Sequence, residues 1–79
     1  MKLPRDLAGE RLAQHLCRDW GYVRVHQVGS HIILETDRPV PHRVAIPAHR
    51  YLRLGTLSAI LRSVAEHKRT DRQSIIDGV

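Results

Sequence analysis

Six histidines are the residues of this chain best suited to proton transfer near neutral pH, because imidazole has an ordinary pKa of about 6.5. His31 differs from the others in its setting, since it directly follows Gly29 and Ser30. Glycine followed by a small polar residue is typical of a two-residue hairpin turn. Such a turn would hold His31 rigidly at the start of a strand, so we take His31 as the candidate general acid or base.

The histidines and the single cysteine do not have the spacing of a metal site. His42 and His49 lie seven positions apart, and Cys17 is the only cysteine. Zinc ligands usually occur in closely spaced pairs of Cys and His, so the sequence predicts neither a metal nor another cofactor. Cys17 cannot form an internal disulfide, and we interpret it as a small buried apolar residue.

The charge of the chain favours a polyanionic partner. Among its 79 residues, 13 Lys and Arg stand against 8 Asp and Glu, which gives a formal net charge of +5. Basic surfaces attract nucleic acid or anionic membranes, and guanidinium groups, which dominate here, favour phosphate and bases. No apolar run reaches the roughly 20 residues of a membrane span, and the N-terminus lacks the apolar stretch of a signal peptide. We therefore expect a cytoplasmic protein with no membrane partner.

The hydrophobic pattern predicts two main helices around three strands. Alternation over residues 22–28 and 31–36, with Gly29-Ser30 between them, indicates a hairpin. Apolar residues at helical spacing predict the flanking helices, with Asp6 and Thr56 as their N-caps. A capping box at residues 70–73 predicts a short third helix. The expected elements are a helix at 7–19, strands at 22–28, 31–36 and 43–46, a helix after Thr56, and a helix at 71–77.

This order predicts an α+β fold with the arrangement α-β-β-β-α. Residues 1–79 would form a single domain in which both helices cover one face of a three-stranded antiparallel sheet. So short a chain has a thin core, which favours a shallow site on an exposed face over a deep cleft. The predicted core consists of Leu12, Leu16, Val25, Leu34, Val44, Leu57, Ile60 and Leu61.

The hairpin register predicts which side chains share the uncovered face of the sheet. Val28 would lie opposite His31, His26 opposite Ile33, and Arg24 opposite Glu35, with Arg43 of the third strand on the same face. Exposed Val28 and Ile33 among charged residues favour a surface for a partner. The alternative is an ordinary solvated face, in which Arg24 and Glu35 form a cross-strand ion pair.

Several short motifs, in order over residues 6–65, resemble the HicA toxins of HicA–HicB toxin–antitoxin systems. They are Trp20-Gly21-Tyr22, Gly29-Ser30-His31, Ile46-Pro47-Ala48-His49, Leu54-Gly55-Thr56-Leu57 and Ile60-Leu61. The resemblance implies a fold similar to a double-stranded-RNA-binding domain. It also implies cleavage of messenger RNA that inhibits translation and growth, and a HicB-type antitoxin that covers the His31 face. The catalytic histidine of the family falls on His31, and Gly29 and Ser30 form the turn that presents it.

The chain departs from the family pattern at several positions. His26 stands where Arg or Lys is common, and Ala48 replaces a usual basic residue. The connection at residues 37–41 is unusual, and residues 66–79 match poorly.

The functional prediction is a metal-independent endoribonuclease. RNA carries its own nucleophile, the 2′-hydroxyl, so His31 could act as the base that deprotonates it or as the acid that protonates the leaving oxygen. The candidate RNA-binding residues are Arg24, His26, Arg43, His49 and Arg50. One alternative is a non-catalytic RNA-binding module, and another is a protein-binding domain that uses Val28 and Ile33.

Overall fold

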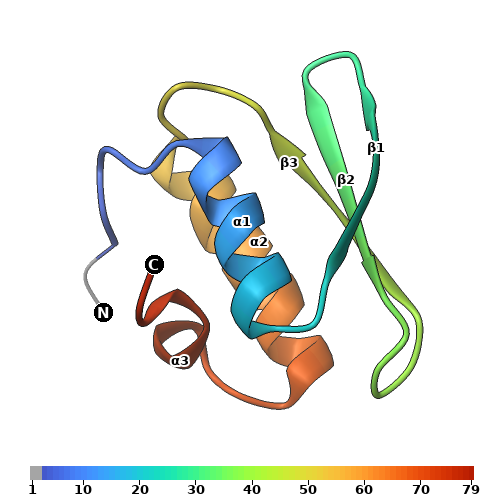
Figure 1. Ribbon diagram of the computed structural model, residues 1–79. Helices are drawn as coiled ribbons and strands as arrows, with labels where there is room; N and C mark the ends of the chain where they lie inside the picture. Colours follow the sequence, from blue (N-terminus) through green and yellow to red (C-terminus); the bar gives the residue numbers. More distant parts are fainter. Residues whose placement is uncertain (1–2) are drawn as a thin grey trace.

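A computed structural model describes residues 3–79 of the chain. Three antiparallel strands form one sheet in the order β1-β2-β3, and α1 and α2 lie together on one of its faces (Figure 1). This is the predicted α+β arrangement, which is thereby confirmed. The elements are α1 (Gly9–Asp19), β1 (Val23–Val28), β2 (His31–Thr36), β3 (His42–Pro47), α2 (Leu54–Lys68) and α3 (Arg72–Ile76).

The core lies between the two long helices and the strands β2 and β3. Ile32 and Leu34 of β2 are fully buried on the helix side, because alternate residues of a strand point to the same face. Val44 and Ile46 continue this layer on β3. The predicted core residues Leu12, Leu16, Leu34, Val44, Leu57, Ile60 and Leu61 are all buried.

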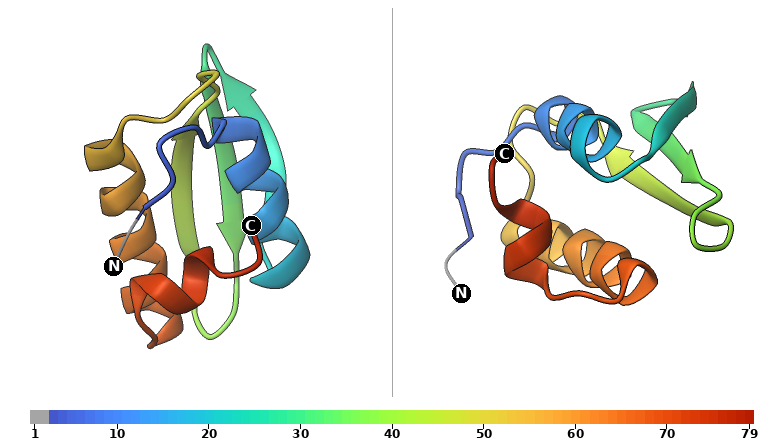
Figure 2. Two further views of the ribbon diagram at one scale, coloured as in Figure 1. Left: turned by 90° about the vertical axis from the view of Figure 1, so that its left-hand side faces the viewer. Right: turned by 60° about the horizontal axis from the view of Figure 1, so that its bottom comes forward.

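Val25 was the one wrong core prediction, since its side chain is 43% exposed. Every residue of β1 is exposed, because β1 is an edge strand of the sheet. It lies at the edge far from α2, while β3 forms the edge near α2 (Figure 2). The pairing with β2 also shifts register between Arg24 and His26, so Val25 is the extra residue of a β-bulge.

The bulge reverses the face on which Arg24 lies. Arg24 pairs with Leu34 instead of the predicted Glu35, and Val23 takes the place opposite Glu35. Because a shift of one residue moves a side chain to the other face of a sheet, Arg24 lies on the helix side. Its guanidinium accordingly forms an ion pair with Glu10 of α1. The predicted ion pair between Arg24 and Glu35 is therefore wrong.

The long helices do not begin at the predicted caps. The N-cap of α1 is Ala8 instead of Asp6, and α2 begins at Leu54, ahead of Thr56; neither helix has a side-chain cap. A tertiary contact replaces the cap of α1, since the Gly9 N–H donates to the carbonyl of His49 at 3.0 Å. Within residues 3–79 no helix is long and apolar enough to cross a membrane.

The short third helix forms as predicted, with one correction to its cap. Its N-cap is Asp71 instead of Thr70, and the Asp71 carboxylate accepts from the Ser74 N–H at 2.8 Å. Ile75 and Ile76 are both buried, so α3 closes the core near the ends of α1 and α2 (Figure 1).

Candidate functional site

The turn that carries His31 has the predicted geometry. Gly29 has φ of 58°, a left-handed conformation that glycine adopts without steric cost. Val28 lies opposite His31 on β1, and Pro47 lies opposite His31 on β3. His31 is therefore the first residue of the central strand, held from both sides, and its side chain is exposed.

The face of the sheet away from α1 and α2 is called the open face here. Its members follow from the register, because cross-strand partners of the exposed β2 positions point to the same side. This placement puts His31 on the same face as His26 and Arg43, as the sequence predicts. The open face consists of Val23, His26 and Val28 on β1, His31, Ile33 and Glu35 on β2, and Arg43 and Ala45 on β3.

Arg43 connects the three strands of the open face. Its Nη2 donates to Nε2 of His26 at 3.2 Å, and its Nε lies 3.5 Å from a carboxylate oxygen of Glu35. All three side chains are at least partly exposed. A guanidinium with exposed, weakly held partners can exchange them for a phosphate, to which it binds in a bidentate manner.

The apolar part of the open face differs from the prediction. Ile33 is only 7% exposed, because His26 and Ala45 flank it on the two neighbouring strands. Val28 is exposed as predicted, at 58%, and the second exposed apolar side chain of this face is Val23, at 62%, instead of Ile33. The candidate partner surface therefore runs along β1.

The loop between β3 and α2 brings two more candidates to the end of the sheet where His31 lies. The Ala48 N–H donates to the carbonyl of Ser30 at 2.6 Å, which ties the loop to the turn before His31. Further along, Leu52 is buried and its N–H donates to the carbonyl of Leu7 at 2.8 Å. His49 and Arg50 lie between these anchors with exposed side chains.

Arg24 is the one candidate that the structure separates from His31. It lies on the helix side of β1, where it donates to the carboxylate of Glu10. This ion pair lowers the pKa of Glu10 through the hydrogen bond from Arg24. Much of the positive charge of Arg24 is therefore balanced locally and does not contribute to the open face.

Sequence reasoning missed a polar cluster at the opposite end of β3. The Nδ1 of His42 lies 2.7 Å from the hydroxyl of Tyr22, and its Nε2 lies 3.1 Å from Oγ of Ser63. His67 stacks on His42 with ring centroids 4.4 Å apart, and Lys68 lies over the Tyr22 ring. These residues come from three segments far apart in the sequence, namely the residue before β1, the start of β3 and α2, so no local pattern indicates that they meet.

The His42 ring bridges the hydroxyls of Tyr22 and Ser63. Burial raises the pKa of Tyr22 to about 12, so its hydroxyl keeps its proton. A neutral imidazole donates at one nitrogen and accepts at the other, so His42 links the two hydroxyls in either tautomer. Burial is the largest effect that lowers the pKa of His42, and the nearby positive charges of His67 and Lys68 lower it further. The cluster is a structural network between β3 and α2.

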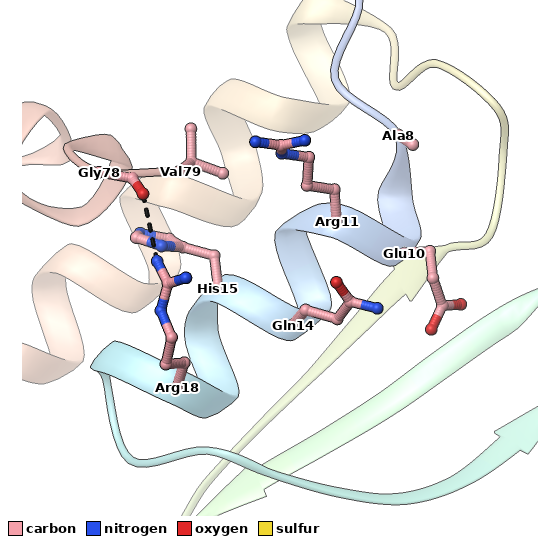
Figure 3. A pocket seen from close by; sticks show the side chains of 8 residues that line it. All are labelled: Ala8, Glu10, Arg11, Gln14, His15, Arg18, Gly78 and Val79. Carbon is pink, nitrogen blue, oxygen red and sulfur yellow. Dashed lines mark hydrogen bonds between the residues drawn. The ribbon is translucent and has the colours of Figure 1, made fainter.

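A separate shallow pocket lies between α1 and the C-terminal residues, and Figure 3 shows its lining. Arg18 lines it, but its guanidinium donates to the Gly78 carbonyl at 3.2 Å and to the carboxylate of Asp19. His15 is buried there, with Nε2 2.7 Å from the Ile75 carbonyl. Both side chains thus hold α1 to the end of the chain, and His31 is not part of the pocket lining.

Within residues 3–79 no group of three or more His, Cys, Asp or Glu side chains is arranged to hold a metal ion. Comparisons with known protein families, curated proteins and solved structures give no match for this chain. The resemblance to HicA toxins therefore stays a prediction, and the functional argument depends on the geometry of the chain itself.

Proposed function

We propose that this protein is a metal-independent endoribonuclease of the HicA type, which cleaves messenger RNA and thereby inhibits translation and growth. The observation that carries the proposal is the placement of exposed His31 at the end of a fixed hairpin turn, on the same face of the sheet as His26 and Arg43, which are hydrogen-bonded to each other. An imidazole can transfer protons near neutral pH, and a guanidinium can bind the phosphate.

The chemistry needs only groups that this face supplies. One base removes the proton of the 2′-hydroxyl, and the 2′-oxygen then attacks the adjacent phosphorus. The bond to the 5′-oxygen breaks as an acid protonates that oxygen, which leaves a 2′,3′-cyclic phosphate and a 5′-hydroxyl. His31 performs one of these two proton transfers, and Arg43 offsets the negative charge that develops on the phosphoryl oxygens.

A HicB-type antitoxin would cover the same face. Val23 and Val28 are large apolar side chains that are more than half exposed, and polar residues lie opposite them, Glu35 opposite Val23 and His31 opposite Val28. Exposed apolar residues among polar ones are typical of a partner surface. An antitoxin on β1 would lie directly beside His31 and block access of RNA to it.

Induced expression in bacteria tests the proposal, with growth and RNA integrity followed together. Wild-type protein should arrest growth and fragment messenger RNA, and His31→Gln should do neither. Arg24→Gln is the matched control, because it changes a charged residue of the same hairpin on the other face of the sheet. If His31→Gln still bound RNA and wild-type protein cleaved none, the protein would be an RNA-binding module instead.

A further inference from the structure

His26 and His31 lie two positions apart across the β1–β2 pair. Val28 is opposite His31, and His26 is opposite Ile33, so the two histidines are diagonal neighbours on the open face. Diagonal neighbours in an antiparallel pair are separated by about 7–8 Å, within reach of long side chains. A phosphodiester bound between them, over Val28 and Ile33, would therefore have an imidazole on each side.

The hydrogen bond from Arg43 fixes the form of the His26 ring in the unbound protein. A guanidinium can only donate, so Nε2 of His26 accepts from Arg43 at 3.2 Å and carries no proton itself. This arrangement is that of the tautomer with its proton on Nδ1. A neutral imidazole is the form that a general base requires.

Cleavage of RNA needs two proton transfers on opposite sides of the phosphorus, and one histidine cannot perform both in the same step. Among the described residues of the open face, His26 is the imidazole besides that of His31. The carboxylate of Glu35 is paired with the guanidinium of Arg43 instead. We propose that His26 is the general base that deprotonates the 2′-hydroxyl, that His31 is the general acid that protonates the leaving 5′-oxygen, and that Arg43 binds the phosphate between them. This proposal rests on the proposed ribonuclease function.

The arrival of the substrate would itself free the base. Hydrogen bonds from guanidinium to phosphate are charge-assisted and stronger than a bond to a neutral ring nitrogen. Arg43 therefore moves from His26 to the phosphate when RNA binds, and the lone pair on Nε2 becomes available. The His31 side chain is exposed at the start of β2, so it can approach the leaving oxygen.

RNA with sulfur in place of the bridging 5′-oxygen at one linkage tests this assignment. A thiolate leaves without protonation, so loss of the general acid should matter little on this substrate, whereas loss of the base should matter fully. On ordinary RNA, His26→Gln and His31→Gln should each lower the single-turnover rate by about 10²–10⁴-fold. On the sulfur substrate, His31→Gln should approach the wild-type rate and His26→Gln should stay slow.

The pH profile gives a second readout that a merely structural role would not change. His26→Gln should remove the fall in rate at acidic pH, because that limb reports protonation of the base. Thermal melting of both variants would verify that these exposed residues are not needed for folding.

The outcomes separate the two proposals. If His26→Gln cleaved ordinary RNA at the wild-type rate, or if sulfur rescued His26→Gln or failed to rescue His31→Gln, the assignment of base and acid would be overturned while the ribonuclease function stood. If wild-type protein cleaved neither substrate, the ribonuclease function itself would be wrong.

Discussion

Gly9 is the position at which a single added methyl group should disturb the candidate site most directly. It is the first residue of α1 and packs against the end of β3 and the loop that carries His49 and Arg50. A Cβ at Gly9 would lie 1.8 Å from the Pro47 carbonyl oxygen and 2.9 Å from its carbon. Both atoms belong to the backbone, so Gly9→Ala requires α1 to move away from this loop.

Three contributions determine the cost of Gly9→Ala. Alanine gains about 1 kcal/mol in helix propensity over glycine. Overpacking costs about 1–3 kcal/mol, and loss of the 3.0 Å hydrogen bond from the Gly9 N–H to the His49 carbonyl costs about 1 kcal/mol more. The net result is a destabilisation of about 1–3 kcal/mol. At about 4–8 °C per kcal/mol for a domain of this size, a central value of about 2 kcal/mol lowers the melting temperature by roughly 8–16 °C.

Gly55→Ala is the matched control, because it makes the same change in the first turn of α2. Nothing lies within 4 Å of a Cβ at Gly55, so this variant should be about 0.4–1 kcal/mol more stable than wild type. Thermal melts of the three proteins give the comparison. Equal melting temperatures for Gly9→Ala and Gly55→Ala would refute the close approach of α1 to Pro47.

The capping carboxylate of α3 should contribute about 1 kcal/mol, so Asp71→Ala should lower the free energy of unfolding by that amount in urea denaturation. Stability should fall as pH drops below about 6.5, because the folded protein lowers the pKa of His42 and protonation then favours the unfolded chain. In thermal melts from about pH 8 to about pH 5, the stability of His42→Gln should therefore fall less with decreasing pH than that of wild type. An equal fall in the two proteins would contradict this contribution of His42. Arg43→Gln should weaken RNA binding and reduce its salt slope by about 1, whereas Arg24→Gln should leave both nearly unchanged. An equal loss of RNA affinity in the two variants would contradict the placement of Arg43 and Arg24 on opposite faces of the sheet.

The elements nearest His31 could be predicted because local signals determine them. Glycine in the left-handed region favours a two-residue turn, and Gly29 has that conformation. The turn fixes the first three pairs of the hairpin, which include His26 opposite Ile33. Alternation along β2 also identifies Leu34 as a core residue. The open face, with His26 and His31 on it, could therefore be predicted from these residues alone.

The rest of β1 could not be predicted, because tertiary packing determines it. Val23 and Val25 alternate with polar residues as a core strand would, but the helices cover β2 and β3 more than β1. The bulge at Val25 turns Arg24 toward Glu10, a residue 14 positions earlier in the chain. No local pattern indicates that contact.

The start of α1 has a similar explanation. Asp6 is a good cap by type, but the contact between Gly9 and His49 begins the helix later. Partners that meet only in the folded chain also explain why the network around His42 was missed.

The proton-transfer role of His31 is the central claim, and one comparison tests it most directly. RNA affinity and the single-turnover cleavage rate at saturating protein would be measured for wild type and His31→Gln, each over a range of salt concentrations. Loss of a general acid or base should reduce the rate by about 10²–10⁴-fold, while the dissociation constant stays within a few-fold and the salt slope is unchanged. Cleavage at a near wild-type rate, together with weaker binding, would contradict the claim and assign His31 to RNA binding alone.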